Sequence, residues 1–207
     1  MAIVVVGGHT RNIGKTSVMT GLISGLPEME WTAFKITQFG HGVCSANGEP
    51  CDCETADHTI AVSEERNRES GTDSSRYLAA GAVRSFWVRT RQGQLAEAMP
   101  RLRREVAGAK NAIIESNSVL RFLQPDFFVS VLDAGTADFK ESAKRYLDRA
   151  DAVVVTGGEL ERAAWKDIST RLVEKARRFS GGPGAYCPEG LVEFVRERVC
   201  TTAPRRR

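Results

Sequence analysis

Long apolar runs are missing from this 207-residue sequence, in which no hydrophobic stretch approaches the roughly 20 residues that a membrane-spanning helix needs. The apolar segment that begins at Ile3 is not preceded by the basic residues of an export signal. We therefore expect a soluble, cytoplasmic protein without a membrane partner.

A strong charge of one sign is missing as well. Lys and Arg total 29 and Asp and Glu total 26, and much of the net charge of +3 comes from residues 101–104 and the terminal residues 205–207. A solvated helix face and a basic tail explain these clusters better than a nucleic-acid surface does. We expect no nucleic-acid partner, and a disordered tail over residues 204–207.

Cysteine is scarce and odd in number, with five residues at positions 44, 51, 53, 187 and 200. In a chain without an export signal, this count indicates reduced thiols or a metal site and not a disulfide framework.

The rest of the pattern predicts one α/β domain. With 42% apolar residues the chain can bury one sizeable core, and neither an internal repeat nor a linker divides residues 1–203. β-Branched runs alternate with helical spacings, which favours a mostly parallel sheet with helices on both faces. Strands are expected at 2–6, 31–37, 83–90, 111–116, 126–133 and 151–156, and helices at 16–26, 73–80, 92–107, 140–150, 162–179 and 191–199.

Residues 2–17 predict a phosphate-binding loop. An apolar strand stops at paired glycines and is followed by Gly-Lys-Thr-Ser at the start of a helical pattern. In such a loop, backbone N–H groups and the positive end of the helix bind phosphate oxygens, the lysine reaches the outer phosphates, and the threonine hydroxyl ligates Mg²⁺. The residues expected to contact a nucleotide are Gly8, Arg11, Asn12, Ile13, Gly14, Lys15, Thr16 and Ser17.

The spacing of the glycines departs from the usual loop. Five residues separate Gly8 from Gly14 in place of four, and His9 occupies the position of the first glycine. The alternative is a plain glycine turn that leaves Lys15 in solvent. Arg11 would either reach the terminal phosphate of its own or a partner's nucleotide, or face solvent.

Acidic residues at the ends of two predicted strands are candidates for catalysis and Mg²⁺ binding. Glu115 ends one strand and Asp133 the next, and parallel sheets bind ligands beyond the carboxyl ends of their strands. A carboxylate there can hold Mg²⁺ or orient a nucleophile. We place Glu115 first and Asp133 second, and the alternative for both is capping of a following helix. The turn at 156–158 either faces the base of the nucleotide or is a plain connection between a strand and a helix.

A glycine-rich insertion, residues 38–58, carries soft metal ligands. Three thiols and two imidazoles fall within 18 residues, and His41, Cys44, Cys51 and Cys53 could bind Zn²⁺ and order the loop. The alternatives are an exposed loop with reduced cysteines and a redox-active thiol site.

Several segments within about the first 120 residues resemble the molybdopterin-guanine dinucleotide biosynthesis adaptor proteins. Beside the phosphate loop, residues 70–83 place Asp73, Arg76 and Ala-Gly-Ala in the order of that family. Residues 34–37 and 114–116 resemble two further segments, with Thr37 in place of His and Ser116-Asn117 in place of Gly. The loop spacing is similar to that of dethiobiotin synthetase. The resemblance implies a P-loop NTPase fold and a homodimer.

Together these features predict a Mg²⁺-dependent protein that binds ATP or GTP and hydrolyses it slowly. The resemblance implies a role in cofactor or metal handling, as in molybdenum cofactor assembly. Lys15 with Glu115 or Asp133 would be catalytic, and Thr16 with Glu115 would hold Mg²⁺. The alternatives are a kinase or ligase that acts on a small molecule, and a metal-binding module controlled by nucleotide. The sequence does not decide between adenine and guanine as the base of the nucleotide, because it has no Asn-Lys-x-Asp signature of guanine specificity.

Overall fold

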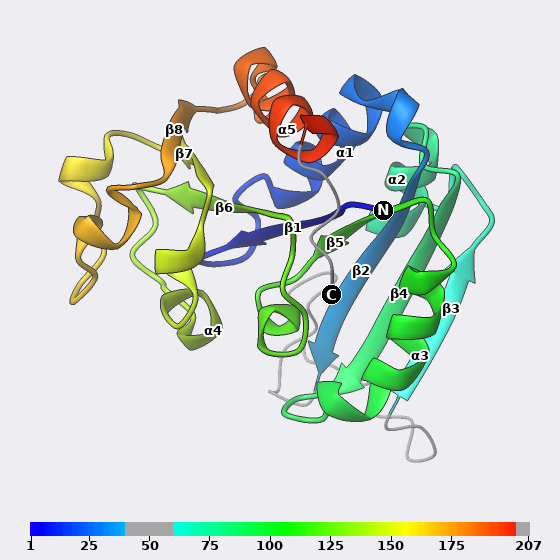
Figure 1. Cartoon of the computed structure of the whole chain (residues 1–207). Coiled ribbons are helices and arrows are strands. Elements are labelled where there is room, and N and C mark those ends of the chain that lie inside the picture. The colour runs from blue at the N-terminus through cyan, green and yellow to red at the C-terminus, as the bar shows by residue number, and fades with distance from the viewer. Residues whose placement is uncertain (40–59, 202–207) are drawn as a thin grey trace.

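Eight strands form one sheet in the order β3-β4-β2-β5-β1-β6-β7-β8 (Figure 1). The structure is a computed structural model that describes residues 1–39 and 60–201. All neighbouring strands are parallel except β3 and β4 at one edge, which confirms the mostly parallel sheet. The strands are β1 (Ile3–Gly8), β2 (Trp31–Phe39), β3 (Ile60–Glu65), β4 (Arg84–Arg91), β5 (Asn111–Glu115), β6 (Phe127–Asp133), β7 (Ala152–Thr156) and β8 (Arg177–Ser180).

Helices cover both faces of this sheet, as expected. The buried strand β1 shows how the faces are divided, because successive side chains of a strand point to opposite sides. Val4 and Val6 pack in the core beneath α1, α2 and α5, whereas Ile3 and Val5 pack beneath α3. The helices are α1 (Lys15–Gly25), α2 (Asp73–Ala79), α3 (Leu95–Ala107), α4 (Glu141–Lys144) and α5 (Glu189–Thr201).

Helix α1 forms where the spacing of apolar residues predicts it. Its residues Val18, Met19, Leu22 and Ile23 are buried, and it ends before Pro27, whose ring and missing N–H would break a helix. None of the described helices is both long enough and apolar enough to cross a membrane.

The predicted helix over residues 162–179 is wrong. This segment contains the short 3₁₀ turn η5 (Thr170–Val173) and then strand β8. Tertiary contacts outweigh its helical spacing, because the Trp165 indole N–H donates to the carbonyl oxygen of Asp133 at 3.0 Å and Phe179 packs against Phe194 of α5. Asp167 also has a φ of 59°, which a right-handed helix cannot contain.

Two smaller differences concern segment boundaries. Residues 140–150 form α4 and a separate 3₁₀ turn, η3 (Leu147–Arg149), in place of one helix. Strand β2 continues to Phe39, which pairs with Arg91, so residues 38 and 39, predicted to belong to the insertion, are part of this strand. His41, Cys44, Cys51, Cys53 and the tail 204–207 lie outside the described residues, and their predictions stay untested.

Candidate functional site

The carboxyl ends of the central strands surround a cavity of about 880 Å³. Small-molecule and cofactor sites have volumes of roughly 300–1,000 Å³. The cavity is lined by the loop after β1, the ends of β2 and β5, the first residues of α2 and α3, and the segment around α4. Glu115 lines the cavity. So do all eight loop residues that were expected to contact a nucleotide, namely Gly8, Arg11, Asn12, Ile13, Gly14, Lys15, Thr16 and Ser17.

The loop reaches α1 through a left-handed turn. Asn12 and Gly14 have φ angles of 56° and 93°, and Gly14 is the N-cap of α1. A Cβ atom at Gly14 would lie 2.2 Å from the ring of Tyr186, so only glycine fits there. The turn brings Lys15 and Thr16 to the cavity wall at the helix N-terminus, where backbone N–H groups have no partner within the helix.

His9, at the position of the usual first glycine, connects the loop to β6. Its buried ring accepts a hydrogen bond at Nε2 from the Asp133 backbone N–H (2.9 Å), and Nδ1 therefore carries the proton that is donated to the carbonyl oxygen of Asp138 (2.7 Å). The ring also packs against Phe139 and Trp165. Burial lowers the pKa of His9, which keeps the ring neutral at neutral pH. This role of His9 could not be predicted from the sequence, because its hydrogen-bond partners lie over 120 residues away along the chain.

Lys15 folds back onto its own loop. Its Nζ donates a hydrogen bond to the carbonyl oxygen of Thr10 at 2.5 Å. Burial lowers the pKa of Lys15 to about 8; Glu115 opposes this shift, and Lys140 and Lys35 add to it. A phosphate group beside Nζ would favour the charged form again, since an opposite charge raises the pKa of a lysine.

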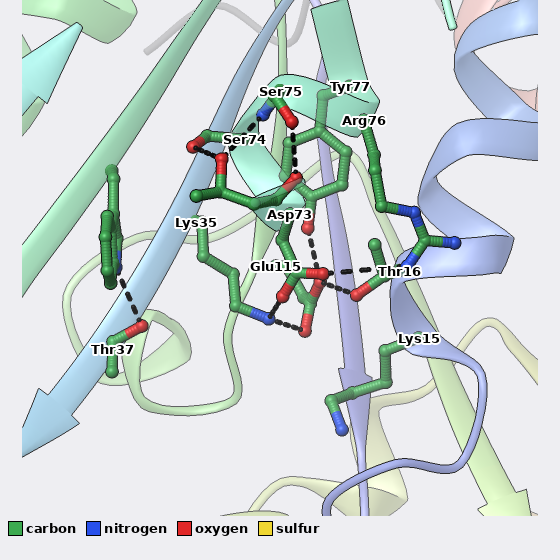
Figure 2. A network of polar contacts seen from close by, with 12 residues as sticks. Lys15, Thr16, Lys35, Thr37, Asp73, Ser74, Ser75, Arg76, Tyr77 and Glu115 are labelled. Atoms are coloured by element: carbon green, nitrogen blue, oxygen red, sulfur yellow. Dashed lines mark hydrogen bonds and ion pairs between the residues drawn. The ribbon is translucent and has the colours of Figure 1, made fainter. Parts of the chain in front are cut away.

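Glu115, at the end of β5, is the centre of a polar network (Figure 2). Its buried carboxylate accepts hydrogen bonds from the Thr16 hydroxyl (3.0 Å), from Nζ of Lys35 (2.5 Å) and from the Tyr77 hydroxyl. Burial, together with Glu115, raises the pKa of Tyr77 well above its usual value, so that this hydroxyl remains a donor. Three donors from α1, β2 and α2 thus converge on one carboxylate.

Asp73 joins this network from the first turn of α2. Its carboxylate lies 2.7 Å from Nζ of Lys35 and 3.8 Å from the guanidinium of Arg76. Burial alone would raise the pKa of Asp73, but Lys35, Thr16 and Arg76 together lower it and keep the group charged. The Lys35 ammonium therefore bridges Asp73 and Glu115. Asp73 is not among the site residues predicted from the sequence, although its place in the adaptor-like segment 70–83 is a signal that could have found it.

The position of Asp73 depends on how α2 begins. Thr72 is the N-cap, and its hydroxyl accepts the backbone N–H of Ser75 at 3.1 Å. The same hydroxyl donates to Glu65 at the end of β3 (3.0 Å), as does that of Ser70 (3.1 Å). The edge strand thus fixes the helix start that presents Asp73 to the cavity.

The oxygen donors of Thr16, Asp73 and Glu115 fit a Mg²⁺ ion. Proteins usually hold Mg²⁺ by one or two carboxylates, with substrate phosphates and water completing the octahedron. Within residues 1–39 and 60–201, no group of three or more His, Cys, Asp or Glu side chains could hold a metal by itself. Phosphate oxygens and water would complete the coordination of Mg²⁺ at this site.

Two residues at which the chain departs from the adaptor pattern have structural roles. The Asn117 side chain accepts the Gly8 N–H (3.0 Å) and donates to the Gly8 carbonyl oxygen (2.8 Å), which ties the end of β5 to the phosphate loop. The Thr37 hydroxyl accepts the indole N–H of Trp87 at 3.0 Å.

Asp133 lies apart from the network around Glu115. Its Oδ1 accepts the backbone N–H of Gly135 at 2.8 Å, and Gly157 packs so closely that a Cβ there would lie 2.2 Å from this oxygen. Neither Asp133 nor the turn 156–158 is among the residues that line the cavity. This geometry is that of a turn-capping carboxylate, and a catalytic role for Asp133 stays a prediction.

Comparisons with known proteins do not identify a family. No protein-family model and no curated protein matches this chain. Matching solved structures include HypB from Helicobacter pylori in complex with nickel, with 13% identity, a TM-score of 0.47, and coverage of 99% of this chain and 91% of that chain. They also include the "apo" form of LpxK from Aquifex aeolicus in complex with ATP, with 17% identity, a TM-score of 0.47, and coverage of 87% of this chain and 53% of that chain. This chain therefore spans about half of the LpxK chain, and both similarities concern the arrangement of sheet and helices alone.

Proposed function

We propose that this protein binds a Mg²⁺–nucleoside triphosphate in the cavity and hydrolyses it slowly. The observation that carries the proposal is the convergence of Lys15, Thr16, Asp73 and Glu115 beside the N-terminus of α1. Lys15 would neutralise the outer phosphates, and the backbone N–H groups of residues 12–16 would bind their oxygens.

Thr16, Asp73 and Glu115 would hold the metal. Mg²⁺, when bound, would neutralise charge that develops on the terminal phosphates. The Thr16 hydroxyl can keep its proton directed at Glu115 while a lone pair of its oxygen faces the ion, because a hydroxyl is both donor and acceptor. The Lys35 ammonium now pairs with both Asp73 and Glu115, and a bound ion would leave this ammonium available to a phosphate oxygen.

Calorimetric titration with non-hydrolysable ATP and GTP analogues, with and without Mg²⁺, tests this proposal and shows whether the protein prefers adenine or guanine. We expect one analogue to bind, and its affinity to fall at least about tenfold without Mg²⁺ or in Glu115→Gln. Binding of neither analogue to the folded protein would overturn the proposal.

A role in molybdenum cofactor assembly, or in other cofactor or metal handling, is the finer form of the proposal. Its support is that Asp73 and Arg76, from the segment that resembles the adaptor family, both line the cavity. The predicted homodimer belongs to the same resemblance, and light scattering at known concentration would measure it. Elemental analysis tests the predicted Zn²⁺ site at His41, Cys44, Cys51 and Cys53, where less than about 0.2 metal per chain would count against it.

A kinase or ligase that acts on a small molecule is the second candidate. The observation in its favour is that the cavity continues beyond the phosphate loop to Gln92 and Phe122. This candidate predicts phosphate release that depends on a metabolite, whereas the first predicts slow turnover without one.

A further inference from the structure

One wall of the cavity is built by two short segments on the face of the sheet opposite α1. The 3₁₀ turn η2 (Ser118–Arg121) follows β5, and the segment 140–146 follows β6. Val119 of the first and Tyr146 of the second belong to the same core cluster, which α3 covers. Arg121, Lys140 and Arg145 line the cavity from these segments, and we call these three residues the cationic wall.

The side chains of the cationic wall have no carboxylate oxygen within ion-pair distance in the part of the chain that the structure describes. Arg121 and Arg145 are exposed, and neither they nor Lys140 form an ion pair, whereas Asp73 pairs with both Lys35 and Arg76. Burial and, after it, the nearby Arg11 lower the pKa of Lys140, and the charges of Asp138 and Glu115 only partly oppose this shift. No ion pair of these three side chains therefore contributes to the stability of the described fold.

The charge of the whole cavity exceeds what the phosphate loop needs. Seven cationic side chains line it, against three carboxylates. A bound Mg²⁺ would itself offset part of the charge of a triphosphate, which reduces the demand for protein cations at the loop. Lys15, Lys35 and Arg76 already lie beside Thr16, Asp73 or Glu115, so the cationic wall is a surplus directed at the same space.

Hydrogen bonds of Gln38 connect the elements beside the wall. The Gln38 side chain donates to the Ser118 hydroxyl at 2.7 Å and accepts the backbone N–H of Gly93 at 3.1 Å. Gln38 thereby connects the end of β2 to η2 and to the turn before α3. Gln92 and Phe122 complete this part of the lining, which offers amide groups and an aromatic ring to a ligand.

We propose that the cationic wall binds a carboxylate or phosphate group of a second, small anionic ligand beside the triphosphate. The inference rests on the proposed function, because it takes the phosphate loop to hold the nucleotide. Paired guanidinium groups suit planar or tetrahedral oxyanions, to which arginine donates two parallel hydrogen bonds. The second ligand would make the protein a two-substrate enzyme or a nucleotide-dependent carrier of an acid.

Two probes test the proposal by calorimetry: inorganic phosphate and succinate, each titrated into protein saturated with the Mg²⁺–nucleotide analogue. We expect at least one of them to bind more tightly than about 1 mM, and the double variant R121A/R145A to weaken it at least about tenfold. The same variant should bind the nucleotide analogue within about threefold of the wild type, which corresponds to less than about 0.7 kcal/mol. Arg101→Ala, an exposed arginine of α3 outside the cavity, is the matched control and should change neither affinity.

Each outcome decides for or against the cationic wall. Binding of phosphate alone or succinate alone, lost in R121A/R145A, supports it and identifies the group. Binding of neither, or equal binding by wild type and R121A/R145A, overturns it, as does a tenfold loss of nucleotide affinity in that variant. If the wild type binds no nucleotide, the proposed function fails separately, and the probes are titrated into nucleotide-free protein with the same two criteria for the wall.

Discussion

The charged side chains on one side of the cavity are paired with one another, whereas those of the cationic wall, on the other side, are not. On the side of α2, Lys35 pairs with both Asp73 and Glu115, and Arg76 supplies the second positive charge. The Thr16 and Tyr77 hydroxyls donate to the other oxygen of Glu115. On the side of η2 and α4, the cationic wall has no ion pair within the described chain. The paired charges hold the scaffold together before any ligand arrives, whereas the unpaired ones become favourable only beside an anion. Substitutions on the two sides should therefore have different consequences.

The largest effect on stability is expected from Lys35→Met. It would leave the Glu115 carboxylate, which is 3% exposed, without its cation, and removal of one partner from a buried pair costs about 3–5 kcal/mol. Urea unfolding followed by circular dichroism measures this loss. A loss below about 1 kcal/mol would show that the pair is no more than a surface contact.

Lys140→Met is the matched substitution on the other side. Lys140 forms no ion pair with the described residues, and the charges of Arg11 and Lys35 near it offset those of Asp138 and Glu115, so the free energy of unfolding should change by less than about 1 kcal/mol. Equal losses in Lys35→Met and Lys140→Met, measured by the same urea titration, would break the comparison.

Tyr77→Phe should lower the free energy of unfolding by about 1.5–3 kcal/mol, the range for a hydrogen bond to a charged group. Tyr146→Phe controls for the change of ring, because the Tyr146 hydroxyl has no hydrogen-bond partner among the described residues. Thermal or urea unfolding of both variants gives the difference. Equal stabilities of the two variants would argue that Glu115 does not depend on Tyr77.

The pKa of Lys15, about 8, makes nucleotide affinity depend on pH. Below pH 8 Lys15 is already protonated in the free protein. Above pH 8 Lys15 must take up a proton when the nucleotide binds. Affinity should therefore be about tenfold weaker at pH 9 than at pH 7, since one pH unit above a pKa corresponds to a tenfold change. Lys15→Arg stays charged throughout and should show a flatter profile. Calorimetry in two buffers of different ionisation enthalpy would detect the proton uptake, and identical profiles for both proteins would contradict this assignment.

His9 predicts a smaller dependence of stability on pH. Its pKa is lowered in the folded protein, so below pH 6.5 the unfolded chain binds a proton that the native ring does not. The free energy of unfolding therefore has its full value, as far as His9 determines it, above pH 6.5. It falls as the pH is lowered from there, by at most about 1.4 kcal/mol per pH unit. Unfolding of the wild type and His9→Gln between pH 5 and 8 measures it. The same slope in both proteins would exclude His9 as the cause.

Local patterns in the sequence predicted most of the strands and helices, and the alternation of these elements predicted the mostly parallel sheet. The apolar spacing of α1 and the glycines before Lys15 lie within 25 residues and need no distant partner. The residues that it missed are assembled by the fold: Asp73 and Tyr77 reach Glu115 only because α2 packs beside β2, and His9 needs the backbone of β6.

The failure at residues 162–179 has the same cause. A helical spacing of apolar residues describes only which faces can be buried, and β7 offers an open edge to Arg177–Ser180. The ladder of β7 and β8, with the Trp165 contact to Asp133, then determines the structure of this segment. Neither contact could be inferred from the spacing of its side chains.

The affinity of Lys15→Ala for the Mg²⁺–triphosphate analogue tests the central claim most directly. Lys144→Ala, which removes a surface lysine paired with Glu141, is its control and should bind like the wild type. The account predicts a loss of at least about 100-fold in Lys15→Ala, the cost of removing a desolvated charge from its anion. Unchanged affinity in a folded Lys15→Ala protein would contradict it and show that this loop does not bind the triphosphate.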